Sequence, residues 1–142
     1  MKAHPPWLVV VAILASGQAP APLELDIAVN GAVTVQHMSR QSVAEVFLLK
    51  RQFWANREPI VIIIQGGDGP LQTAFCAKIL ETSCDAMDQA ELEKRYQNNL
   101  FVRVVRATSS ADAMQLLQRY PTALAYFRRG TAPAGARVVL QP

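Results

Sequence analysis

The sequence contains few of the side chains from which metal centres and active sites are built. Its 142 residues include only two histidines and two cysteines. His4 lies at the extreme N-terminus, and His37 has no second histidine or carboxylate at ligand spacing, so no metal site is expected. No evident histidine partner exists for the candidate nucleophiles Ser42, Ser83, Ser109 and Ser110. We therefore predict that the protein is not an enzyme and needs no cofactor.

Charged residues are also scarce, at 18% of the chain against 51% hydrophobic residues. This balance indicates a globular protein, and the length suits one domain with one compact core. The 14 Lys and Arg exceed the 11 Asp and Glu only slightly, which gives a formal net charge of +3. The basic pairs are interspersed with acids and carry no interleaved aromatic residues, so nucleic-acid binding is not expected.

The N-terminal apolar run, Trp7 to Ala15, is too short to span a bilayer, which needs roughly 20 residues. It follows Lys2 and precedes the small residues Ser16 and Gly17. This arrangement is typical of a secretory signal peptide. We therefore expect a periplasmic or otherwise secreted protein, with no stable membrane span after cleavage.

Two cleavage positions fit this segment. Cleavage after Gly17 places small residues where signal peptidase reads them, and cleavage after Ala19 would leave Pro20 in the next position. We expect residues 1–17 to be the signal peptide and residues 18–142 to form a single domain.

Export matters for the two cysteines, Cys76 and Cys84, because an oxidising compartment permits a disulfide. On one continuous helix the two residues would lie about 12 Å apart, beyond the roughly 7 Å that a disulfide can bridge. A disulfide therefore requires the helix to end between them, and Glu81-Thr82-Ser83 is a plausible end. The alternative is two separately buried thiols.

The patterns of apolar residues predict strands separated by helices. Alternation from Leu23 to Val29 indicates a half-buried first strand, and the unbroken run Ile60 to Ile64 indicates an interior strand covered on both faces. Further strands are expected at 101–105, 123–127 and 138–140. Helices are expected after Ser39, from Pro70, from Asp85 to about Asn98, and after Thr108-Ser109-Ser110. The fold class is therefore α/β, a three-layer sandwich with a mostly parallel or mixed sheet.

Three motifs occur in a recognisable order. Val29-Asn30 ends the first strand, Val46-Phe47-Leu48-Leu49-Lys50 precedes Trp54, and Pro121-Thr122-Ala123-Leu124-Ala125-Tyr126 enters a later strand. Together they resemble short phosphate-binding-protein-like (PBP-like) domains, which are related to the periplasmic substrate-binding proteins of phosphate ABC transporters. Leu49 stands where that family has glycine. The resemblance extends from about Leu25 to Phe127 and implies the fold of one lobe of a type II periplasmic binding protein.

In the larger proteins of this kind, an arginine and a Gly-Ser-Gly-Thr-like loop at a helix N-terminus hold phosphate. The equivalent loop here, Gln65 to Leu71, lacks both the arginine and the hydroxyls. Gly67 and Gly69 would still let backbone amides approach an anion. Asp68 opposes a fully ionised phosphate but can accept a hydrogen bond from a protonated one. The alternative is a structural turn in which Asp68 caps the next helix.

A second candidate for an oxyanion lies where the strand at 101–105 meets the following helix. Arg106 offers a guanidinium, and Thr108, Ser109 and Ser110 offer hydroxyls and free amides. In the related proteins the residues before this helix lie near the ligand cleft, so they would supplement Gly67 and Gly69 across the strand ends. Ordinary helix capping is the alternative.

Phe53, Trp54 and Tyr126 are expected to pack the first helix against the sheet rather than to stack on a ligand. Two functions then fit the sequence. The first is a non-catalytic domain that binds phosphate or another small oxyanion. The second is a periplasmic interaction or accessory subunit that kept the fold, lost the ligand and binds an envelope protein.

Overall fold

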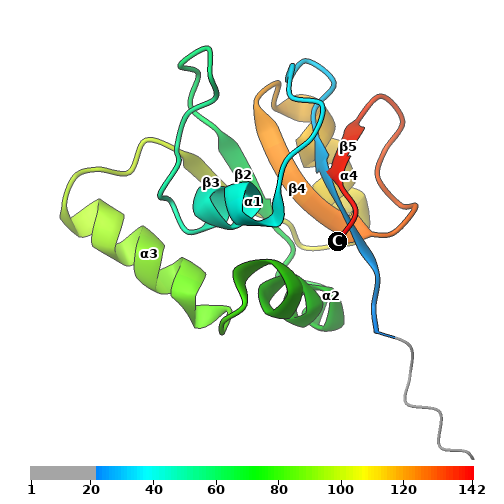
Figure 1. The fold of residues 1–142 in the computed structure, drawn as a ribbon, viewed down its shortest axis with the longest axis horizontal. Helices are drawn as coiled ribbons and strands as arrows, with labels where there is room; N and C mark the ends of the chain where they lie inside the picture. Colours follow the sequence, from blue (N-terminus) through cyan, green and yellow to red (C-terminus); the bar gives the residue numbers. More distant parts are fainter. Residues whose placement is uncertain (1–21) are drawn as a thin grey trace, which may run out of the picture.

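The computed structural model describes residues 22–142, and the expected signal peptide with its cleavage site lies outside the described residues. Figure 1 shows the course of the chain. The strands are β1 (Leu25–Val29), β2 (Val61–Ile64), β3 (Arg103–Arg106), β4 (Ala123–Arg128) and β5 (Arg137–Leu140). The helices are α1 (Arg40–Phe47), α2 (Gly69–Phe75), the π-helical turn η1 (Cys76–Leu80), α3 (Asp85–Tyr96) and α4 (Ser110–Arg119). None of the helices described is long and apolar enough to cross a membrane.

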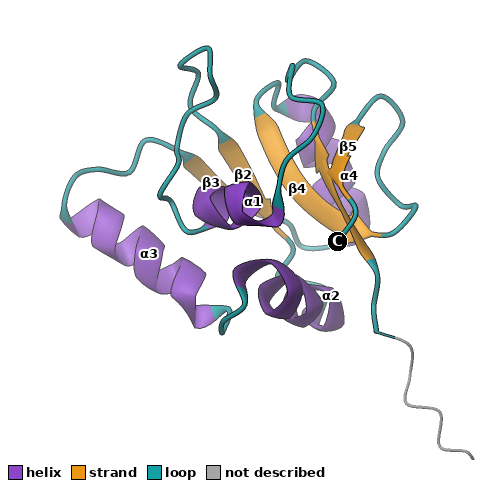
Figure 2. Cartoon of the chain, viewed as in Figure 1, coloured by secondary structure: helices purple, strands orange, loops and turns teal. Residues whose placement is uncertain are grey.

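The five strands form one mixed sheet with the order β3-β2-β4-β1-β5. Strand β2 pairs in parallel with both β3 and β4, whereas β1 pairs in antiparallel with β4 and β5. Figure 2 shows helices on both sides of this sheet. The three-layer α/β architecture predicted from the sequence is therefore confirmed, and the run before Gln65 is an interior strand as expected.

Alternation along the strands separates two cores. The face under α1 and α2 carries large side chains, among them Ile62, Ile64, Leu124 and Tyr126. The opposite face carries mostly alanines with Ile63 and Phe127, and α4 packs there through Ala113 and Leu117. Small residues on that face let a single helix lie close to the sheet, while the larger face needs several helices to cover it.

The first strand differs from the prediction of a half-buried strand, because every residue of β1 is buried. Asp26, on the face shared with Ala28, is only 2% exposed. Its carboxylate accepts hydrogen bonds from Gly130 N at 2.9 Å and from Gln141 Nε2 at 3.1 Å. Arg129 Nε lies 3.4 Å from the same carboxylate. Residues near the C-terminus therefore supply the hydrogen bonds that stabilise the buried carboxylate of Asp26.

The prediction for the three aromatic residues is correct for two of them. Trp54 is buried and donates from Nε1 to the carbonyl of Thr122 at 2.9 Å, and Tyr126 is fully buried. Phe53 differs, because it is 39% exposed and packs on Phe101 with ring centroids 5.6 Å apart. It follows α1 on a loop and does not fix that helix to the sheet.

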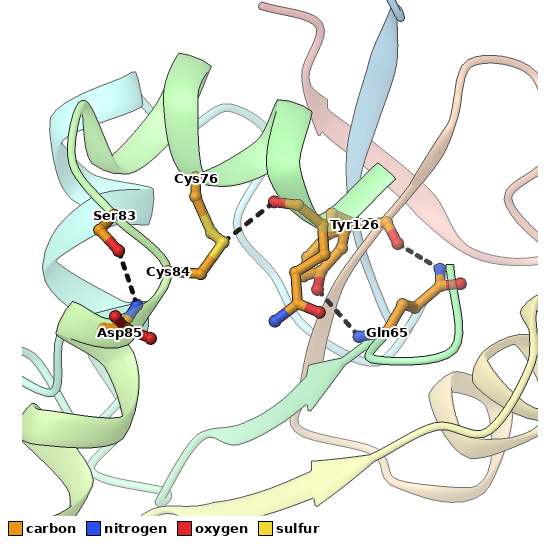
Figure 3. Close-up of a disulfide and its surroundings, with 7 residues drawn as sticks. Gln65, Cys76, Ser83, Cys84, Asp85 and Tyr126 are labelled. Atoms are coloured by element: carbon orange, nitrogen blue, oxygen red, sulfur yellow. Dashed lines mark hydrogen bonds between the residues drawn. A yellow bond between two sulfur atoms is a disulfide. The ribbon is translucent and has the colours of Figure 1, made fainter. Parts of the chain in front are cut away.

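Helix α3 is connected to the core by a disulfide. Cys76 in η1 and Cys84 just before α3 are bonded, with their Cα atoms 5.3 Å apart (Figure 3). The helical run ends between them at Glu81, whose φ of 55° is left-handed. Within α3 only Met87 and Glu91 are buried. This helix is thus the most exposed of the four α-helices in the described part of the chain, as its polar sequence indicated.

Candidate oxyanion site

The carboxyl ends of β2, β3 and β4 lie at one edge of the sheet, because these three strands run parallel. Each end leads into a segment with polar groups: Gln65 to Gly69 after β2, Ala107 to Ser109 after β3, and Arg128 with Arg129 at the end of β4. Ligands of open α/β sheets bind outside such carboxyl ends. We call this edge, with the three segments, the rim.

Gly67 and Thr108 bring the two predicted loops into contact. A Cβ atom at Gly67 would lie 2.2 Å from the carbonyl oxygen of Thr108 and 3.5 Å from the backbone nitrogen of Ser109. Only glycine permits this approach of backbone to backbone. At Gly69, by contrast, an added Cβ would have no heavy atom within 4 Å. The two segments named from the sequence therefore form one continuous surface.

Asp68 caps α2 and forms an ion pair with Arg128. Its Oδ1 accepts from Leu71 N at 3.2 Å. Arg128 Nε donates to Oδ2 at 2.8 Å, and Nη2 donates to Oδ1 at 2.9 Å. The hydrogen bond from Arg128 is the largest of the effects that hold the pKa of Asp68 below its usual value, against an opposing effect of burial. The capping function expected of Asp68 is present, together with an ion pair that the sequence did not indicate.

Arg128 is the basic side chain that sequence reasoning missed. It is the last residue of β4, and its side chain is 44% exposed. The signal that could have found it is the pair Arg128-Arg129 directly after the expected strand at 123–127, since β4 and β2 end at the same edge. The hydrogen bond to Asp68 raises the pKa of Arg128.

Arg106 is directed toward α3. Its Nη2 donates to Glu91 Oε2 at 2.8 Å and to Asp88 Oδ1 at 3.2 Å. Burial alone would raise the pKa of Glu91, but hydrogen bonds from Arg106 and Arg95 outweigh it and lower that pKa. Arg106 is thus paired, through Nη2, with two carboxylates of α3 beside the rim.

The residues at the start of α4 cap the helix. Ser109 Oγ accepts from Asp112 N at 3.0 Å, and Asp112 Oδ2 accepts from Thr108 N at 2.9 Å and from Thr108 Oγ1 at 3.3 Å. Ser110 is the first residue of the helix and is exposed. The carboxylate of Asp112 therefore occupies donors that the sequence assigned to a ligand. The amides of Ser110 and Ala111 lie in the first turn, where no intrahelical partner exists.

Gln65 immediately precedes Gly66 and Gly67 in the sequence, and it is 1% exposed. Its Nε2 donates to the carbonyl of Tyr126 at 2.6 Å, and its backbone N donates to Tyr126 Oη at 2.9 Å (Figure 3). Burial raises the pKa of Tyr126 to about 12, so the phenol stays protonated at neutral pH. Gln65 Oε1 has no partner, alone among the buried side-chain oxygen and nitrogen atoms of the residues described.

Within residues 22–142, no three or more His, Cys, Asp or Glu side chains lie together in a group that could hold a metal ion. The rim instead presents groups that suit an anion: exposed glycine amides, helix-start amides and the guanidinium groups of Arg128 and Arg129, with the carboxylates of Asp68 and Asp112 beside them. Its net charge is low because Arg128 pairs with Asp68, and Arg129 pairs with Glu24 and Asp26.

Comparison with models of known protein families and with curated proteins gives no match. Among the solved structures that share the fold are the following two. One is a protein from Clostridium perfringens, described as a phosphate ABC transporter substrate-binding protein and solved with bound phosphate, with a TM-score of 0.61 and 13% identity. The other is an ABC-type phosphate transport receptor from Vibrio cholerae, with a TM-score of 0.62 and 12% identity.

Each match covers 82% of this chain. The chain spans only 44% of the first structure and 45% of the second. At these identities the likeness concerns the fold alone, and it confirms the fold predicted from the sequence motifs. The chain therefore has the fold of a single-lobe PBP-like domain, similar to less than half of a phosphate-transport binding protein.

Proposed function

We propose that this protein is an exported, non-catalytic binding domain that takes phosphate or another small oxyanion at the rim. The observation that carries the proposal is the contact between Gly67 and Thr108, because it joins two segments with exposed amides at the carboxyl ends of parallel strands. Backbone amides in such a place suit a negatively charged oxygen.

The charges of the rim limit the strength of this binding. Asp68 and Asp112 each place a carboxylate close to the amides, and a dianion would be repelled by both. A singly charged, protonated oxyanion suffers less repulsion and can donate a hydrogen bond to a carboxylate. We therefore expect weak binding that strengthens when the ligand is protonated.

Titration calorimetry at low salt with inorganic phosphate and with sulfate tests this proposal. We expect heat of binding for the wild type and at least about tenfold weaker binding, or about 1.4 kcal/mol, for Gly67→Ala. The added methyl group would push the Thr108 carbonyl away and open the rim. Thr82→Ala is the control, because Thr82 is exposed and lies outside the rim, between η1 and α3.

Absence of heat from the wild type with both anions would contradict the ligand proposal. If the two alanine substitutions weakened anion binding equally, the contact between Gly67 and Thr108 would not be needed for binding.

A second function is favoured by the outer face of α3. Leu92 is 70% exposed and Tyr96 is 89% exposed, and Tyr96 lies four positions after Leu92, so they lie on one side of the helix. Apolar side chains this exposed are typical of surfaces that bind other proteins. We therefore propose, as the second function, an interaction subunit that binds an envelope partner through this face.

The second function predicts a partner that depends on this face. In a cross-linking experiment with envelope extract, we expect a product with the wild type that is lost with Leu92→Glu/Tyr96→Glu. The control is Gln89→Glu/Glu93→Gln, which alters exposed polar residues of the same helix without changing the total charge. Identical products from all three proteins would count against an interface on α3.

A further inference from the structure

We propose that the guanidinium group of Arg128 binds the oxyanion, in place of the arginine that the loop after β2 lacks. This inference rests on the oxyanion-binding function proposed above. It assigns the principal cation of the site to the end of β4, and it names Asp68 as the group that positions that cation.

The ion pair leaves most of the guanidinium available. An arginine carries five N–H donors, and Arg128 uses one on Nε and one on Nη2 for Asp68. The other three N–H groups have no partner among the described residues. Because Asp68 fixes the plane of the guanidinium in a two-point contact, these donors are held in one orientation, which favours an oxyanion with two oxygens in reach.

The position of Arg128 separates it from Arg106. Asp68, the partner of Arg128, belongs to the glycine loop itself and follows Gly67 directly. The partners of Arg106, Glu91 and Asp88, belong to α3 and not to that loop. Of these two arginines at the strand ends, only Arg128 is therefore tied to the rim.

Calorimetric titration with inorganic phosphate at low salt tests the assignment. We expect Arg128→Gln to weaken phosphate binding at least tenfold and Arg128→Lys, which keeps the charge but loses the fork, to have an intermediate effect. Arg103→Gln makes the same charge change at the amino end of β3 and should bind phosphate within about twofold of the wild type.

Asp68→Asn distinguishes a ligand role from a structural one. Asparagine can still cap α2, and the substitution breaks the ion pair while leaving Arg128 in place. If Arg128 matters only as the partner of Asp68, Asp68→Asn will lose binding as Arg128→Gln does. We expect instead that Asp68→Asn weakens phosphate binding less than Arg128→Gln does, because the cation remains while the two-point contact that orients it is lost.

The outcomes separate the two proposals. Phosphate binding by the wild type that is unchanged in both Arg128 variants, or lost only in Arg106→Gln, would overturn the assignment and leave the oxyanion function standing. A wild type that binds no phosphate would overturn the function itself. Thermal unfolding of each variant in the absence of phosphate shows whether a loss of binding reflects a loss of fold.

Discussion

Phe75→Ala is expected to lower the free energy of unfolding by about 3–5 kcal/mol, the usual cost of emptying a buried phenylalanine site. Phe75 is fully buried at the end of α2. Its ring stacks on Tyr126 with centroids 4.1 Å apart and meets Phe47 edge-on at 4.6 Å. The substitution would leave a cavity among α1, α2 and the sheet, and the neighbouring rings are too rigid to fill it.

Urea unfolding followed by circular dichroism measures this cost. Phe53→Ala is the matched control, because Phe53 is 39% exposed and should lose about 1 kcal/mol or less. If the two variants unfold at similar urea concentrations, the three-ring cluster is not the centre of the core.

The sequence predicted the elements whose causes are local. The β-branched run before Gln65 indicated an interior strand, and β2 occupies that position between β3 and β4. Ser39 and Ser109 were expected at the starts of helices, and each accepts a hydrogen bond from the backbone N–H three residues later. Both signals act within a few residues, so a single sequence contains all the information that they need.

The errors arose where partners come from distant parts of the chain. Alternation in β1 indicated one polar face, yet Asp26 is buried, because Gly130 and Gln141 lie more than 100 residues further along the chain and supply its donors. The sequence showed an apolar-polar pattern but could not show that the polar positions were covered.

The same limit applies to the rim. The order of strands and helices predicted parallel strands, and parallel strands predicted that the loops at Gly67 and Thr108 would lie close together. The choice of cation did not follow, because Arg106 and Arg128 both end strands at this edge. Only the structure shows which acid each arginine contacts. Arg106 forms an ion pair with Glu91 of α3, whereas Arg128 forms one with Asp68, 60 residues away in the sequence.

Removal of the disulfide by Cys76→Ala/Cys84→Ala is expected to destabilise the protein by about 2–3 kcal/mol, the loss of loop-closure entropy for a short loop. The two cysteines are separated by 8 positions in the sequence and join η1 to the start of α3. Alanine avoids placing a hydroxyl at Cys76, which is 2% exposed. Urea unfolding of the oxidised wild type and of the variant measures the difference.

The effect of the disulfide should be concentrated in α3. This helix buries only Met87 and Glu91, so its remaining ties to the core are few: packing around Met87 and the ion pair between Glu91 and Arg106. Hydrogen exchange should therefore accelerate in α3 far more than in β2 or β4 when the disulfide is removed. Reduction of the wild type with a thiol should reproduce this change and should leave the double variant unaffected. Two free thiols in protein folded under oxidising conditions, or uniform acceleration across the sheet, would contradict an anchoring role for Cys76 and Cys84.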